Sequence, residues 1–288
     1  MPDQLLMNEP IIVTKTVKNS GPTVAVFAGV HGNERVGIMA IERLLSEIEV
    51  KAGVVHFVIA NPLAVEKNVR FVEKNLNRRF LEDNQEVSME DDIARKLMKL
   101  LDSCDALLDL HACNEPEIEP FVICEEKSLK MAEIFDVGTV SIGWKDFEAG
   151  STDAYMDRQG KIAIGLECGS VDSPEKYVQF TKDAVVRFLE ELGCLARVNT
   201  RIKARVQNKI KITGAVSMPE AGIRFKKNYK TFDVIPKGEV FASSGEKEYV
   251  FPENGVIIFP RPKSPLGAEA CLMGMFLPKD GLNSSAPE

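Results

Sequence analysis

Residues 23–34 have the sequence TVAVFAGVHGNE, in which a run of apolar residues leads directly into a polar group. The first seven residues are typical of a strand that is buried on both faces of a sheet. In residues 35–48, directly after this stretch, the apolar side chains Val36, Met39, Ala40 and Leu44 recur at helical spacing. A buried strand followed by an amphipathic helix predicts one unit of a parallel sheet with helices on its faces.

The same alternation continues for most of the chain. Further strands are predicted at residues 53–60, 106–110, 121–124 and 161–166, and further helices at 91–101 and 173–192, where Ser173 and Pro174 form a typical helix start. This order predicts an α/β fold with a mostly parallel sheet flanked by helices.

The sequence pattern changes after about residue 197. Short β-like runs, at 250–251 and 256–259, are separated there by the turn signals Pro236-Lys237-Gly238, Ser244-Gly245 and Asn254-Gly255. We therefore expect a catalytic α/β domain at residues 1–197 and a smaller β-rich domain at 198–288, with a loosely structured tail from Asp280.

Composition excludes several classes of partner. The 288 residues carry a formal net charge of −7, which disfavours nucleic acid as a ligand. In the one basic stretch, residues 201–211, the charged residues alternate with Ile and Val, and the stretch is interpreted as a strand with a solvated face.

No apolar run is long enough for a membrane span and residues 1–10 show no signal peptide, so a cytoplasmic protein with no membrane partner is expected. The six scattered cysteines are expected to be free thiols.

Two of the three histidines directly follow predicted strands. Because the carboxyl ends of parallel strands meet at one edge of a sheet, His31, Glu34 and His111 are expected to lie together there. Two imidazoles and a carboxylate leave one position of a tetrahedral zinc ion open for water, which is the arrangement of catalytic zinc. The H-x-x-E spacing alone is a weak signal. The interpretation as a metal site is strengthened by Gly32, which leaves backbone room beside His31, and by the separate buried strand that precedes His111.

Two other residues that titrate have different interpretations. His56 lies inside a predicted strand and is expected to be a structural histidine facing a packed layer. Glu167 follows the apolar run 162–166, and beside a zinc site it would act as general base and then as proton donor. A capping or salt-bridged glutamate is the alternative.

The segment 61–80 is rich in polar residues that bind anions. Guanidinium groups bind carboxylates and stabilise oxyanions, so this segment beside a zinc site suggests an anionic substrate. Surface salt bridges are the alternative interpretation. The residues concerned are Arg70, Arg78, Arg79, Asn75 and Asn77.

These motifs, in this order, resemble the succinylglutamate desuccinylase and aspartoacylase family, which is related to the zinc carboxypeptidases. The resemblance spans nearly the whole N-terminal domain and continues weakly into the C-terminal one. The matching motifs are Gly29-Val30-His31-Gly32-Asn33-Glu34, Asn61-Pro62 through Arg70-Phe71 to Asn75-Leu76-Asn77-Arg78, Asp109-Leu110-His111 and Gly165-Leu166-Glu167.

The resemblance implies a zinc carboxypeptidase-like fold and a role for each matching residue. One Zn²⁺ per chain would be held by His31, Glu34 and His111, with Glu167 activating water and Arg70 stabilising the oxyanion. Asn77 and Arg78 would hold the substrate carboxylate, with Arg158 as a further contact of less certain alignment. Asn75 stands where the family usually has Asp, and neither Tyr229 nor Tyr249 is matched to the family's substrate-contacting tyrosine.

The resulting expectation is a zinc-dependent amidohydrolase that removes an N-acetyl or N-succinyl group from a small, acidic amino acid. The alternatives are a zinc carboxypeptidase acting on small peptides and a metal-dependent binding protein without turnover. The expected partner is thus a small N-acyl amino acid, and a homo-oligomer stays open. Cys113 and Cys168 lie next to the expected site and are interpreted as packing residues.

Overall fold

The computed structural model describes residues 8–197 and 205–278. The chain forms two compact units, one of Met1–Gly138 with Trp144–Gln207 and one of Thr139–Gly143 with Asn208–Glu288. The predicted boundary between residues 197 and 198, the first part of the basic stretch at 201–204, and the tail from Asp280 lie outside the described residues, so these expectations stay predictions. Among the described helices, none is both long and apolar enough to cross a membrane.

The strands of the first unit lie in the order β1-β3-β2-β4-β7-β5. The four inner strands, β3, β2, β4 and β7, run parallel, and the flanking strands β1 and β5 are antiparallel to their neighbours. The mostly parallel α/β fold is therefore confirmed. The bounds are β1 Ile11–Thr16, β2 Thr23–Ala28, β3 Val54–Ile59, β4 Ala106–Cys113, β5 Phe121–Cys124 and β7 Ile162–Ser170.

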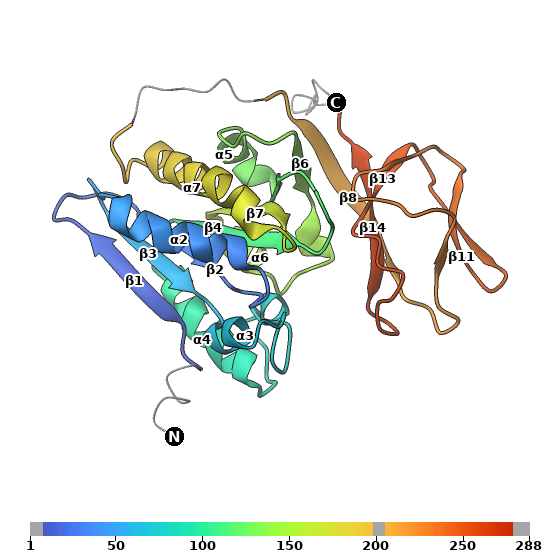
Figure 1. Cartoon of the computed structure of the whole chain (residues 1–288), viewed down its shortest axis with the longest axis horizontal. Helices are drawn as coiled ribbons and strands as arrows, with labels where there is room; N and C mark the ends of the chain where they lie inside the picture. The colour runs from blue at the N-terminus through green and yellow to red at the C-terminus, as the bar shows by residue number, and fades with distance from the viewer. Residues whose placement is uncertain (1–7, 198–204, 279–288) are drawn as a thin grey trace, which may run out of the picture. The chain divides into compact units, whose positions relative to one another are not determined.

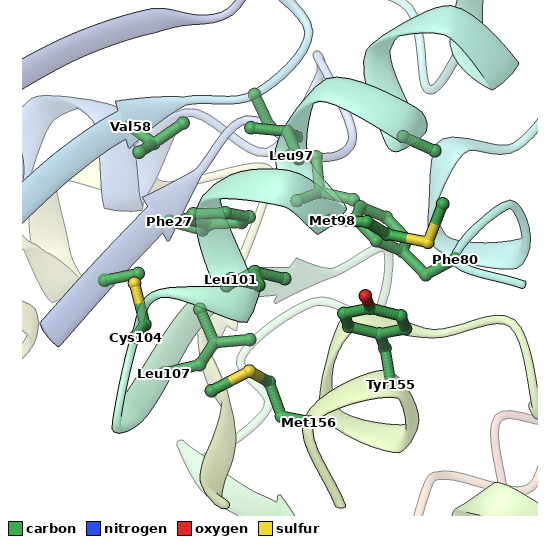
Figure 2. Packing of buried hydrophobic residues seen from close by; sticks show 14 of the residues in the cluster. Phe27, Val58, Phe80, Leu97, Met98, Leu101, Cys104, Leu107, Tyr155 and Met156 are labelled. Atoms are coloured by element: carbon green, nitrogen blue, oxygen red, sulfur yellow. The ribbon is translucent and has the colours of Figure 1, made fainter. Parts of the chain in front are cut away.

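Helices cover both faces of this sheet. Helices α2 (Arg35–Glu47) and α7 (Pro174–Glu191) pack against each other over one face (Figure 1). On the other face, α4 (Met89–Asp102) and α6 (Thr152–Arg158) pack against strand residues such as Phe27 and Leu107, with Leu97 and Met156 among the buried side chains between them (Figure 2). Short helical segments occur at α3 Pro62–Glu66, η1 Leu76–Arg78, η2 Glu126–Ser128, α5 Leu129–Ala132 and η3 Trp144–Asp146.

Strands β4 and β7 extend further than the sequence predicts. The apolar runs end at residues 110 and 166, but β4 continues to Cys113 and β7 to Ser170. His111 and Glu167 therefore lie within strands rather than after them, and they are direct neighbours in the parallel register of the two strands. The polar side chains do not end the strands because the backbone ladder continues between β4 and β7.

The second unit is all β within the described residues, which agrees with the expected β-rich region. Strands β6, β8, β14, β13 and β10 are hydrogen-bonded in that order, and a three-stranded sheet has the order β12-β11-β9. Phe241, Phe251 and Ile257 are among the buried residues of its own core. The bounds are β6 Thr139–Ile142, β8 Asn208–Ser217, β9 Arg224–Phe225, β10 Val234–Ile235, β11 Val240–Ser244, β12 Lys247–Val250, β13 Gly255–Ile258 and β14 Glu269–Phe276.

Candidate active site

The first part of the site is a tight turn between β2 and α2. Gly29 has a φ of +66°, a conformation that suits glycine, and the Glu34 amide donates to the His31 carbonyl at 3.2 Å. A Cβ on Gly32 would lie 2.1 Å from the carbonyl carbon of Ala64, so only glycine fits there. The turn brings His31 and Glu34 to the same side, with His31 Nδ1 2.8 Å from Glu34 Oε1.

His111 on β4 completes a buried cluster with these two residues. Its Nδ1 lies 3.0 Å from Glu34 Oε2, and the amide of Ala112 donates to the same oxygen at 3.0 Å. Potential ligand atoms of His31, Glu34 and His111 all lie within 4.8 Å of one another. The three residues are thus brought together from β4 and the turn after β2, as the sequence predicts.

Each imidazole is held from behind by an oxygen atom. His31 Nε2 lies 2.9 Å from Asn75 Oδ1, and His111 Nε2 lies 3.0 Å from Asp109 Oδ2. An amide or carboxylate oxygen can only accept, so both Nε2 atoms are assigned as donors and both Nδ1 atoms face Glu34. Second partners of this kind are what orients histidines that bind metals.

The electrostatics of the cluster favour a charged carboxylate between imidazoles. Burial acts to raise the pKa of Glu34, but His31 and His111 hold that pKa well below its ordinary value. Burial lowers the pKa of His31, so this imidazole is neutral at neutral pH. Burial also acts to lower the pKa of His111, but the neighbouring Asp109 raises it well above the ordinary value.

Asp109 is itself tied to the first turn of α6. Thr152 Oγ1 donates to Asp109 Oδ2 at 2.5 Å, and the Thr152 amide donates to Asn77 Oδ1 at 3.1 Å. Ser151 caps this helix by accepting a hydrogen bond from the Ala154 amide. Thr152 was not recognised in the sequence, although a Ser-Thr pair before a helix is a common sign of a cap.

Glu167 reaches the cluster from β7, the strand beside His111. Burial raises the pKa of Glu167 to about 7, and the negative charge of Glu34 adds to this rise while His111 opposes it. The Cys113 thiol donates to Glu167 Oε2 at 3.1 Å. Cys113 therefore contacts the carboxylate of the predicted general base, which goes beyond the packing role expected for it.

The segment before η1 supplies Arg70 to the cluster. Arg70 Nη1 donates to Glu34 Oε1 at 2.9 Å, and the Arg70 carbonyl accepts from the Gly32 amide at 3.2 Å. The buried Glu90 of α4 holds the residues that follow, because its carboxylate accepts from three consecutive amides, those of Val72, Glu73 and Lys74. Glu90 was not singled out in the sequence, since nothing local distinguishes it from an exposed glutamate in a first helical turn.

The remaining arginines of this segment are paired with carboxylates of the protein. Arg78 forms an ion pair with Glu148 through Nη2, and its Nη1 donates to the Asn77 carbonyl at 2.9 Å. Arg79 Nε donates to the buried Asp91 at 2.6 Å. Salt bridges thus account for contacts of both arginines, which was the alternative interpretation of this cluster.

The structure does not bring Arg158 to the cluster. Its Nη1 donates to the Ala149 carbonyl at 2.6 Å and its Nη2 to the Phe80 carbonyl at 2.7 Å. It ends α6, six residues beyond Thr152, which corresponds to about 9 Å along a helix axis. Its assignment as a substrate contact therefore stays a prediction that no observed contact supports.

His56 and the cysteines are structural in different ways. His56 is only half-buried and its Nδ1 lies 2.8 Å from Thr14 Oγ1 on the edge strand β1, so the expected packed layer around it is wrong. All six cysteines are buried and free of disulfides, as predicted. Burial raises the pKa of Cys168 well above its ordinary value, which keeps its thiol protonated.

Comparison with known proteins identifies the family. The succinylglutamate desuccinylase/aspartoacylase catalytic domain matches residues 20–192. A succinylglutamate desuccinylase from Shewanella sp. (strain W3-18-1) is 26% identical over 294 residues, covering 89% of this chain and 83% of the relative. An N-acyl-aromatic-L-amino acid amidohydrolase (carboxylate-forming) from Xenopus laevis is 33% identical over 101 residues, covering 31% of this chain and 33% of the relative.

Solved structures show the same fold. The crystal structure of succinylglutamate desuccinylase from Vibrio cholerae has a TM-score of 0.79 at 20% identity, covering 92% of this chain and 85% of that one. The product-bound structure of the ectoine utilization protein EutE (DoeB) from Ruegeria pomeroyi has a TM-score of 0.72 at 19% identity, covering 92% and 88%. The chain therefore belongs to the succinylglutamate desuccinylase/aspartoacylase family of hydrolases.

Proposed function

We propose that this protein is a zinc-dependent amidohydrolase that removes the acyl group from a small N-acyl amino acid. The observation that carries the proposal is the buried cluster of His31, Glu34 and His111, whose ligand atoms lie within 4.8 Å of one another. Glu167 is the neighbour of His111 in the adjoining strand. A metal site and a carboxylate side by side are the two components that metal-assisted amide hydrolysis needs.

The donor set suits one zinc ion per chain. Zinc accepts imidazole nitrogen and carboxylate oxygen in tetrahedral geometry, and three protein ligands leave one position for substrate or water. His31 Nδ1 is buried and has no hydrogen-bond partner, although Glu34 Oε1 lies 2.8 Å away. A buried nitrogen lone pair without a donor is explained if it binds a cation. Asn75 and Asp109 fix the ring orientation that such binding requires.

Bound zinc would polarise the amide carbonyl of the substrate and favour ionisation of the attacking water. The carboxylate of Glu167 would accept the proton of that water and deliver it to the leaving amine. In the metal-free protein burial raises the pKa of Glu167 to about 7, and a bound cation nearby would lower it and so favour the carboxylate that accepts the proton. The thiol of Cys113 would hold Glu167 in place while it exchanges the proton.

Arg70 and the residues of η1 would bind the charged parts of the substrate. Arg70 already donates to Glu34 at the edge of the cluster, where its other N–H groups would stabilise an oxyanion. Arg78 would bind a substrate carboxylate together with Asn77, whose side-chain oxygen is fixed by the Thr152 amide. No step is assigned to Arg158.

The test is zinc content together with amine release from N-acetyl and N-succinyl derivatives of aspartate, glutamate and leucine, with and without a chelator. We expect about one zinc per chain and release that stops with the chelator. Glu167→Gln should keep zinc and lose about 10²- to 10⁴-fold in kcat, whereas His111→Ala should lose zinc as well. Activity on dipeptides but not on N-acyl amino acids would indicate the carboxypeptidase alternative. Bound zinc with no turnover of either class would indicate a binding protein.

A further inference from the structure

The ion pair between Arg78 and Glu148 bears on which class of N-acyl amino acid the site would bind. The two terminal nitrogens of Arg78 already have acceptors, the Asn77 carbonyl and the Glu148 carboxylate. A carboxylate binds a guanidinium bidentately through a pair of neighbouring N–H groups. Glu148 therefore competes with a substrate carboxylate for Arg78.

Glu148 is held near this position by its own backbone. Its amide donates to the Trp144 carbonyl at 2.7 Å, and its carbonyl accepts from the Ser151 amide at 3.0 Å. In the next turn, Gly150 approaches Arg78 so closely that a Cβ on it would lie 2.4 Å from the Arg78 carbonyl oxygen. The Glu148 side chain is 15% exposed, so the ion pair is partly shielded from solvent.

A second carboxyl group, that of Asp153, lies near this pair. Asp153, on the first turn of α6, is buried, and burial together with the negative charges of Glu148 and Asp109 raises its pKa. The other two arginines of this segment are also paired, Arg70 with Glu34 and Arg79 with Asp91. Within the described residues of the first unit, the arginines of this segment are therefore already matched by carboxylates of the protein.

From this arrangement we infer that Glu148 is a specificity-determining residue that selects N-acyl amino acids with a single carboxylate and an uncharged side chain. The inference rests on the proposed function of the site. One substrate carboxylate displaces Glu148 from Arg78, and the displaced Glu148 stays nearby as a negative charge. A second carboxylate on the substrate is then repelled. This differs from the acidic substrate that the arginines suggest when they are considered without their partners.

The repulsion is large enough to measure. Two like charges in one partly shielded pocket, at an effective dielectric constant of about 20 and with screening by salt, change binding by about 10-fold. The structure therefore predicts a preference of about 10-fold in kcat/KM for N-acetyl-leucine over N-acetyl-aspartate. Replacing Glu148 by glutamine should remove most of that preference.

The experiment compares zinc-loaded wild-type protein with Glu148→Gln, Glu148→Asp and the control Asp146→Asn. Asp146 is exposed and lies two residues before Glu148, so its substitution makes the same charge change on the same turn. For each protein, kcat/KM is measured on the leucine and aspartate substrates, and binding of free leucine and free aspartate is measured by calorimetry. Glu148→Gln should raise the aspartate-to-leucine ratio about 10-fold in both measurements. Glu148→Asp and Asp146→Asn should leave the ratio within about twofold of wild type, because each retains the negative charge beside Arg78.

The binding measurement separates this inference from the proposed function. If no N-acyl amino acid is hydrolysed but wild type binds leucine in preference to aspartate and Glu148→Gln loses that preference, the proposed function fails and the selectivity assignment stands. If hydrolysis proceeds but wild type accepts aspartate as well as leucine, the assignment of Glu148 is overturned. Equal wild-type ratios for the two amino acids would overturn the assignment even if the Glu148→Gln protein does not fold.

Discussion

Glu90 offers the most direct test of how the site is held in place. Its side chain is fully buried in the first turn of α4. Glu90 Oε1 accepts from the Val72 amide at 2.7 Å and from Asn61 Nδ2 at 3.2 Å, and Oε2 accepts from the Lys74 amide at 3.1 Å. The Glu73 amide lies within 3.3 Å of both oxygens. These bonds fix the backbone between the two residues, Arg70 and Asn75, that contact the cluster.

Glu90→Gln keeps the shape of this side chain but replaces one acceptor with a donor. With the amide nitrogen at the Oε2 position, the Lys74 amide loses its acceptor, and an unsatisfied buried N–H costs about 1–3 kcal/mol. The remaining bonds change from charge-assisted to neutral, at a cost of about 0.5–1 kcal/mol each for the strongest two. We therefore expect the free energy of unfolding to fall by about 2–5 kcal/mol.

The assay is urea denaturation of the metal-free proteins, with zinc affinity measured in parallel by competition with a chelator. The control is Asp92→Asn, which removes an exposed charge from the same helical turn and should change stability by less than about 1 kcal/mol. Zinc should bind more weakly to Glu90→Gln, because Asn75 would no longer orient His31. Equal stability of the two variants would refute the argument that Glu90 anchors this segment.

Two further substitutions test the turn and the segment beside it. Gly32→Ala should prevent folding or abolish zinc binding, because the new Cβ would lie 2.1 Å from the Ala64 carbonyl carbon. The control Gly138→Ala should be tolerated, because the nearest atom to its Cβ is 3.9 Å away. Circular dichroism and zinc content check both variants. Asp91→Asn should destabilise the protein at neutral pH but not at low pH. Burial acts to raise the pKa of Asp91, but hydrogen bonds from groups including Arg79 hold it below the ordinary value, so its stabilisation is present above about pH 4 and is lost as pH falls through the folded pKa. Denaturation between pH 3 and 7 should show the difference from wild type shrinking as pH falls, and a constant difference would contradict the assignment.

Local patterns in the sequence predicted the central strands and the long helices, but not β1, β6 or α6. The strand at residues 121–124 was predicted with the bounds that β5 has, and the three main helices were predicted to within two residues at each end. Apolar periodicity determines these elements because each must bury one side against the rest of the fold. Apolar periodicity also placed the ends of β4 and β7 too early, because His111 and Glu167, which continue these strands, are polar.

The site could be predicted only as far as its residues follow elements in the chain. His31, Glu34 and His111 lie together because topology brings the ends of β2 and β4 to one edge. Their roles stay predictions. The partner of Arg78 could not be found from the sequence, because Glu148 lies 70 residues away in an irregular segment. The orientation of Arg158 could not be predicted either, because its acceptors are backbone carbonyl groups, which are present in every sequence.

The direct pairing of His111 with Glu167 has a consequence for how proteins of this fold diversify. The spacing between these two residues is set by hydrogen bonds between neighbouring strands rather than by loops. Segments such as the one carrying Glu148 can therefore be lengthened, shortened or exchanged without moving His111 relative to Glu167. For protein engineering, this separates two tasks. Substrate preference can be searched in loop libraries around the site while His111 and Glu167 stay fixed by β4 and β7.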